Sequence, residues 1–82
     1  MIVSRPLQVS VANDIPSGTI DGTNATFTTS MAFMAGTARV YLNGVRQKSG
    51  AGNDYQEVGA NTLVFALPPK AGDVILVDYA KG

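Results

Sequence analysis

The chain has 82 residues, with six basic and six acidic side chains and no Cys, His or Trp. This length predicts one small domain with a modest core, and the composition excludes disulfides, zinc–cysteine sites and histidine-based catalysis. The balanced charge argues against nucleic-acid binding, and the longest apolar stretches, of five residues, are too short for insertion into a membrane.

Short runs rich in Val, Ile, Thr, Tyr and Phe recur at intervals of about eight to twelve residues, separated by Gly, Pro, Asn and Asp. Because no longer window keeps an apolar stripe of helical period, we expect little or no helix. The pattern predicts an all-β fold. We expect a small antiparallel β-sandwich or open barrel of six to seven strands, with an extended N-terminal arm.

The amino end is the first predicted element. Leu7, Val9 and Val11 alternate with polar or small residues, which predicts an extended arm or edge strand over residues 1–18, followed by the sandwich domain over residues 19–82. An arm that is apolar at alternate positions is suited to strand addition to a neighbouring subunit.

The next run predicts a half-buried strand in which Ala25, Phe27 and Thr29 alternate with Thr and Ser. The turn over residues 21–24 precedes this strand. Phe27 is the residue that we expect to anchor it in the core.

Asn43 and Gly44 lie between two β-prone runs and are the strongest hairpin signal in the chain. Both central residues of a type I′ turn need positive φ, which Asn tolerates and Gly adopts freely. The predicted register of this two-residue loop is Leu42 opposite Val45, Tyr41 opposite Arg46, and Val40 opposite Gln47.

Three more strands are predicted after the loop at residues 49–53. Residues 54–58 and 62–67 read as a hairpin around a tight turn at 59–61, with the second strand the more buried. Residues 68–72 cannot continue a ladder, because proline has no N–H to donate. The last strand covers residues 73–79, and its four consecutive aliphatic residues predict burial on both faces, inside a sheet or against a partner chain.

Several of these segments, in this order, resemble a small β-sandwich module of tailed-bacteriophage virion proteins, notably tail fibres and other appendages. The resemblance covers roughly residues 20–80. It is carried by these strings: Asp21-Gly-Thr-Asn-Ala-Thr-Phe27, Val40-Tyr-Leu-Asn-Gly-Val-Arg-Gln-Lys48, Asn53-Asp-Tyr55, Gly59-Ala-Asn-Thr-Leu-Val-Phe65, Pro68-Pro-Lys-Ala-Gly-Asp73 and Val77-Asp-Tyr79.

The resemblance implies a bacteriophage virion structural protein without enzymatic activity or cofactor. Its place would be the head, as a decoration or cement protein, or the tail, neck or fibre, after assembly in the host cytoplasm. Because a domain of this size has a thin core, we expect a homo-oligomer that also contacts other virion proteins. The resemblance to fibre and decoration proteins implies a homotrimer as the first choice. The alternative is a module on the virion surface that binds a host carbohydrate or receptor.

The candidate interaction surface combines alternating apolar residues of the arm with aromatic and charged strand residues. Its members are Leu7, Val9, Val11, Arg39, Tyr41, Arg46 and Tyr79. The charged members are read either as solvated side chains or as groups that set the choice of partner.

Three further features have both a structural and a functional interpretation. Asn43 and Gly44 either only close the hairpin or also contact a receptor. The three tyrosines are either half-buried strand residues with their hydroxyls at the rim or a stacking platform for sugars. The oxygen-bearing side chains Asp21, Asn24, Asn53 and Asp54 are explained by Asx turns, with a calcium site as the less favoured alternative.

Overall fold

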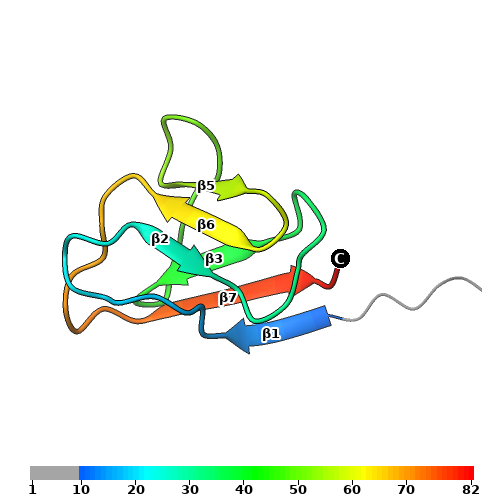
Figure 1. Ribbon diagram of the computed structural model, residues 1–82, viewed down its shortest axis with the longest axis horizontal. Coiled ribbons are helices and arrows are strands. Elements are labelled where there is room, and N and C mark those ends of the chain that lie inside the picture. The colour runs from blue at the N-terminus through cyan, green and yellow to red at the C-terminus, as the bar shows by residue number, and fades with distance from the viewer. Residues whose placement is uncertain (1–9) are drawn as a thin grey trace, which may run out of the picture.

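The computed structural model describes residues 10–82, which form seven β-strands and no helix (Figure 1). The strands are β1 (Ser10–Asp14), β2 (Thr26–Thr28), β3 (Arg39–Leu42), β4 (Val45–Arg46), β5 (Tyr55–Val58), β6 (Thr62–Phe65) and β7 (Ile75–Ala80). Nothing in this range is a helix long and apolar enough to cross a bilayer. The predicted all-β class and number of strands are confirmed.

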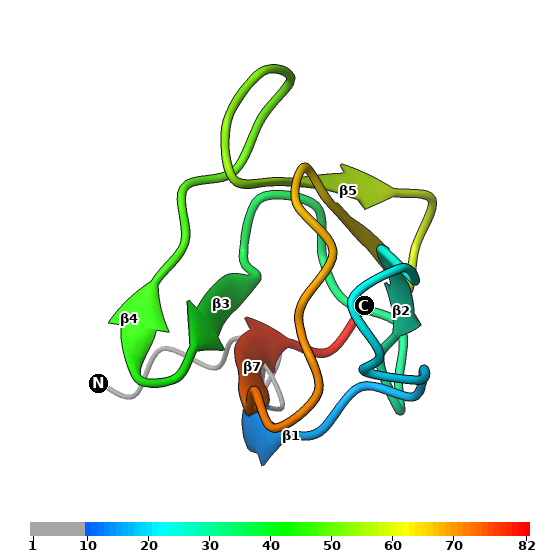
Figure 2. The ribbon, with the colours of Figure 1, turned by 90° about the vertical axis from the view of Figure 1, so that its left-hand side faces the viewer.

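The strands pair in two antiparallel sheets. One has the order β1-β7-β3-β4 and the other the order β2-β6-β5. Figure 2 shows the two sheets as separate layers, with β1, β3, β4 and β7 in one and β2 and β5 in the other. Because β7 lies between β1 and β3, strands from the two ends of the described chain are neighbours. The arrangement is the predicted small β-sandwich.

The hairpin between β3 and β4 has the predicted turn and register. Asn43 and Gly44 have φ values of 53° and 82°, as a type I′ turn requires. Leu42 pairs with Val45 and Tyr41 pairs with Arg46. The backbone N–H of Gln47 also donates to the carbonyl of Val40, at 2.8 Å. This local prediction is confirmed.

The hairpin between β5 and β6 is also confirmed. Its register runs over four pairs, from Tyr55 opposite Phe65 to Val58 opposite Thr62. Gly59 has a φ of 66°, which allows the chain to turn tightly over residues 59–61. β2 pairs with the other side of β6, so β6 is the central strand of its sheet.

The core lies between the sheets and is built around aromatic rings. Phe27 is fully buried, as predicted, and its ring packs at 90° to that of Phe65, with 5.6 Å between the centroids. Within residues 10–82, ten hydrophobic side chains are buried: Phe27, Phe33, Ala38, Val40, Tyr55, Leu63, Phe65, Ile75, Val77 and Tyr79.

Two predictions about burial are wrong. β6 ends at Phe65, which pairs with Tyr55 at the start of β5, and Leu67 is 81% exposed rather than part of a buried strand. In β7, Ile75 and Val77 are buried, whereas Leu76 is only half-buried. β7 is interior in its sheet, with a neighbour on each side, but only one of its faces points to the core.

β1 forms one edge of the four-stranded sheet. Its register to β7 shifts between Val11 and Asp14, where Asn13 has a φ of 57°. Residues 10–14 therefore form an edge strand. Leu7 and Val9 lie outside the described residues, and the predicted boundary between arm and sandwich stays a prediction.

Candidate functional site

The four-stranded sheet brings three of the predicted interaction residues together on the face that points away from the core. Tyr41 pairs with Arg46, and Arg39 precedes Tyr41 by two residues, so all three side chains lie on one face. Across β7, Tyr41 is opposite Leu76 and Arg39 is opposite Asp78. These five residues form the outer face: half-buried Tyr41 and Leu76, with exposed arginines and a half-buried aspartate around them.

Two other predicted members of the interaction surface lie elsewhere. Tyr79 is 4% exposed and belongs to the core, where its hydroxyl donates to Asp14 at 3.0 Å. Its assignment to a surface is wrong, because β7 turns its odd-numbered residues inward. Val11, opposite Tyr79 in the register, is partly buried and packs against the core. Leu7 and Val9 lie outside residues 10–82.

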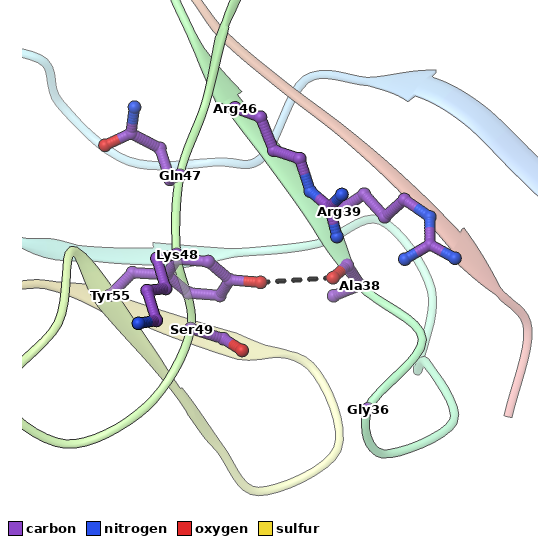
Figure 3. Close-up of a pocket in the computed structure, with 8 residues that line it drawn as sticks. All are labelled: Gly36, Ala38, Arg39, Arg46, Gln47, Lys48, Ser49 and Tyr55. Carbon is purple, nitrogen blue, oxygen red and sulfur yellow. Dashed lines mark hydrogen bonds between the residues drawn. The ribbon is translucent and has the colours of Figure 1, made fainter.

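A small pocket opens beside the outer face, where the chain leaves the β3–β4 ladder. After Gln47 the chain crosses to the other sheet, where the carbonyl of Lys48 accepts hydrogen bonds from the start of β5. Tyr55 fills the place that a longer β4 would occupy, and its hydroxyl donates to the carbonyl of Ala38 at 3.1 Å (Figure 3). The pocket of about 340 Å³ is lined by Gly36, Ala38, Arg39, Arg46, Gln47, Lys48, Ser49 and Tyr55.

The pocket gathers the positive charge of residues 39–48 on one side of the β3–β4 hairpin. Arg39, Arg46 and Lys48 line it, which is half of the six basic residues of the chain. Within residues 10–82, none of the three has a carboxylate partner at ion-pair distance. The register of the hairpin could have indicated that Arg39 and Arg46 are diagonal neighbours, and Lys48 follows Arg46 by two residues, but no sequence signal placed Tyr55 beside them.

Tyr55 is a neutral hydrogen-bond donor in the wall of this pocket. Burial raises the pKa of its phenol, and the nearby Glu57 carboxylate raises it further. A hydrogen bond from Ser49 and the charges of Arg46 and Arg39 act in the opposite direction, without reversing the shift. The hydroxyl therefore keeps its proton at neutral pH and holds the Ala38 carbonyl in place of a strand neighbour.

The hairpin turn is tied to the loop that precedes β7. The amide nitrogen of Asn43 donates to a carboxylate oxygen of Asp73 at 3.0 Å, and its amide oxygen accepts the Val74 N–H at 2.9 Å. These hydrogen bonds, first that from Asn43 and then that from the Lys70 backbone, hold the pKa of Asp73 below its usual value. The side chain of Asn43 thus connects the β3–β4 turn to the loop before β7, in addition to its place in the turn.

The tyrosines do not form an exposed platform. Tyr55 and Tyr79 are buried at 2% and 4% exposure, and Tyr41 alone of the three is partly accessible. Both buried hydroxyls donate to partners within the protein. The alternative in which all three rings stack on a sugar is therefore wrong, because two of them are needed in the core.

The oxygen-rich loops are organised by turn hydrogen bonds. One carboxylate oxygen of Asp21 accepts from the N–H and the hydroxyl of Thr23 and from the Asn24 N–H. The hydrogen bonds of Asn53 and Asp54 are likewise to nearby backbone. Among the described residues, no group of three or more His, Cys, Asp or Glu side chains could hold a metal ion. Asx turns at Asp21 and Asn24 account for the first loop, as predicted, whereas Asn53 and Asp54 hold the second loop by bonds to the earlier residues Ser49 and Lys48.

Two large apolar side chains outside the core are strongly exposed, one directly after the β3–β4 turn and one after β6. Val45 is 64% exposed and Leu67 is 81% exposed. Leu67 also lines a groove of about 430 Å³ with Leu42 and Phe65. Exposed apolar groups around a groove are typical of contact surfaces.

Comparison with known proteins gives no match to a family model, to a curated protein or to a solved structure. The resemblance to the bacteriophage module therefore rests on the motifs of the sequence.

Proposed function

We propose that this chain is a non-enzymatic structural protein of a tailed-bacteriophage virion that acts by assembling with other subunits. The observation that carries the proposal is the ordered set of turn motifs along the chain. Two of these motif segments are the hairpin turns of the sandwich: Asn43 and Gly44 join β3 to β4, and residues 59–61 join β5 to β6.

The outer face supports assembly as the mode of action. Tyr41 and Leu76 lie side by side across β3 and β7 and remain partly accessible, with Arg39 and Arg46 beside them. Interface centres are enriched in Tyr and Arg in this way. Because the core of so small a domain is thin, burying this face between subunits would add stability. A homotrimer that also contacts other virion proteins is the assembly that we favour.

Purified virions test the proposal directly. Mass spectrometry should find the chain in particles, and electron micrographs of particles made without it should lack a decoration, neck, tail or fibre density. Absence of the protein from intact particles, together with unchanged particles in its absence, would contradict the proposal.

A second candidate is a module that binds a host-surface carbohydrate or receptor. The pocket beside the outer face favours it, because Arg39, Arg46 and Lys48 offer hydrogen-bond donors around a space of ligand size. A glycan array tests this candidate. Signal that is lost on Arg46→Gln and kept on Lys70→Gln supports it, and an array without signal contradicts it.

A further inference from the structure

Three cationic side chains surround one small space in a chain whose formal net charge is zero. Arg39 and Arg46 reach it from neighbouring strands, and Lys48 from the segment that leaves the sheet. Figure 3 shows both arginines beside β3 and, across the ring of Tyr55 in this view, the side chain of Lys48, with Ser49 below the ring. The pocket is lined by three segments of backbone, at residues 36–39, 46–49 and 55, that the fold holds together.

The positions of the two arginines follow from the sheet. Arg46 is opposite Tyr41, so Arg39 is its diagonal neighbour on the same face. Diagonal neighbours in an antiparallel pair lie about 7–8 Å apart at their Cα atoms, which allows two long side chains to approach one ligand. The sheet register thus fixes the arginines at a spacing suited to a shared anion.

Two carboxylates lie near the pocket, and each accepts a hydrogen bond from a backbone N–H. Glu57 accepts the Gly36 backbone N–H at 3.0 Å. Asp78, opposite Arg39 in the register, accepts the Asn13 N–H at 2.8 Å. Across the part of the chain that the structure describes, no carboxylate lies within ion-pair distance of the three cations. Three like charges repel one another, and a bound anion would relieve that repulsion.

The donors of the pocket match an oxyanion. A guanidinium presents its N–H groups as a fork that fits two oxygens of a carboxylate or phosphate, and the ammonium of Lys48 adds a third charge. The hydroxyl of Ser49 also lines the space. A volume of about 340 Å³ is at the small end for ligand sites. We propose that this pocket binds the carboxylate or phosphate group of a ligand about the size of one sugar residue.

This inference does not depend on the virion assignment, and it narrows the carbohydrate candidate to acidic ligands. The test is a titration of the ¹⁵N-labelled full chain, followed by NMR at low ionic strength. The probes are glucuronate, inorganic phosphate and, as a neutral control with the same ring, glucose. We expect saturable amide shifts at residues 38–39, 46–49 and 55 with at least one anion and none with glucose.

The two anions distinguish the source of the oxyanion. Tighter binding of glucuronate identifies a carboxylate site, and tighter binding of phosphate identifies a phosphate site. In both cases added salt should weaken binding, because exposed charges are screened. Shifts with neither anion, or shifts spread equally around Lys70 and Lys81, would overturn the proposal.

Matched variants locate the site. Arg46→Gln should weaken the binding by about tenfold or more, since hydrogen bonds between charged groups are strong. Lys70→Gln removes the same charge from the turn before β7 and should leave the affinity unchanged. Lys48→Gln removes a second charge from the pocket and should also weaken the binding. An unchanged melting temperature shows that a variant is folded. Equal weakening by Lys70→Gln and Arg46→Gln would overturn the proposal.

Discussion

The two hairpins of this sandwich differ in how they contribute to the fold. The β5–β6 hairpin has four residue pairs and contributes Tyr55, Leu63 and Phe65 to the core. The β3–β4 hairpin has two pairs, and both residues of β4, Val45 and Arg46, are exposed. One hairpin is held by burial on both of its strands, whereas the other depends on β3, its turn and the neighbouring loop.

This difference in packing assigns the two hairpins different roles, stability of the fold to β5–β6 and interaction to β3–β4. Because β4 is short and exposed, its side chains are free to vary without opening the core. The pocket lies where β4 ends early, since the hydroxyl of Tyr55, and not a residue of a longer β4, donates to the carbonyl of Ala38 before β3. The weakly packed hairpin thus carries the candidate site, and the strongly packed one carries the fold.

The largest contrast is expected from truncating one apolar side chain in each hairpin. Leu63→Ala should destabilise the protein by about 2–5 kcal/mol, because Leu63 is fully buried in β6. Val45→Ala, at a 64% exposed position in β4, should stay within about 0.5 kcal/mol of the parent. Urea denaturation measures both, and similar losses at the two positions would contradict the separation.

The turn of the weaker hairpin gives the next effect. Gly44→Val places a β-branched residue at a φ of 82° and should cost about 1–3 kcal/mol. A side chain at this position meets no other atom within 4 Å, so the loss reports backbone strain alone. Gly44→Asn, which tolerates positive φ, is the control and should lose less. An unchanged melting temperature for Gly44→Val would disprove the turn assignment.

The hydrogen bond from Tyr55 of β5 to the residue before β3 links the two hairpins, and its removal should cause a smaller loss of stability. Tyr55→Phe removes the hydroxyl that donates to the carbonyl of Ala38 and should cost about 1 kcal/mol in chemical denaturation. Tyr41→Phe changes the same group on the outer face, at a partly accessible position, and should cost less. Equal effects at the two tyrosines would show that the hydroxyl of Tyr55 does not support the end of β3.

Acid should loosen the β3–β4 turn before the β5–β6 hairpin. Because its folded-state pKa is lowered, Asp73 stabilises the fold above its ordinary pKa of 3.8, and this contribution is lost as the pH falls through the lower folded value. NMR should show the amides of Asn43 and Val74 shifting in this acid range while that of Leu63 changes little. Asp73→Asn should remove this response, and an unaltered response in the variant would exclude Asp73 as its source.

Elements set by local geometry could be predicted from the sequence. Asn43 and Gly44 determine both the turn and the register of β3 and β4, because type I′ geometry needs only neighbouring residues. The alternating pattern around Phe27 correctly placed that residue in the core. Gly and Pro marked the ends of the later strands, so the fold class and the number of strands could be predicted.

Features set by contacts between remote segments could not be predicted from the sequence. The aliphatic run at residues 74–77 gave no sign that one face of β7 is only half-buried, because that depends on how the two sheets stack. Tyr79 was misplaced for the same reason. The pocket needs Tyr55, from the other sheet, beside the start of β3, an arrangement created by the crossing between sheets. The site, unlike the hairpin, is a property of the tertiary structure.

We propose that the outer face joins subunits. Sedimentation velocity at micromolar concentration tests it on the full chain, whose monomer mass is 8.5 kDa. The wild-type protein and Val58→Lys, altered at an exposed position of the other sheet, should both sediment with three times this mass. Tyr41→Lys should sediment as a monomer. A wild-type chain that stays monomeric, or a trimer that survives Tyr41→Lys, would contradict the claim.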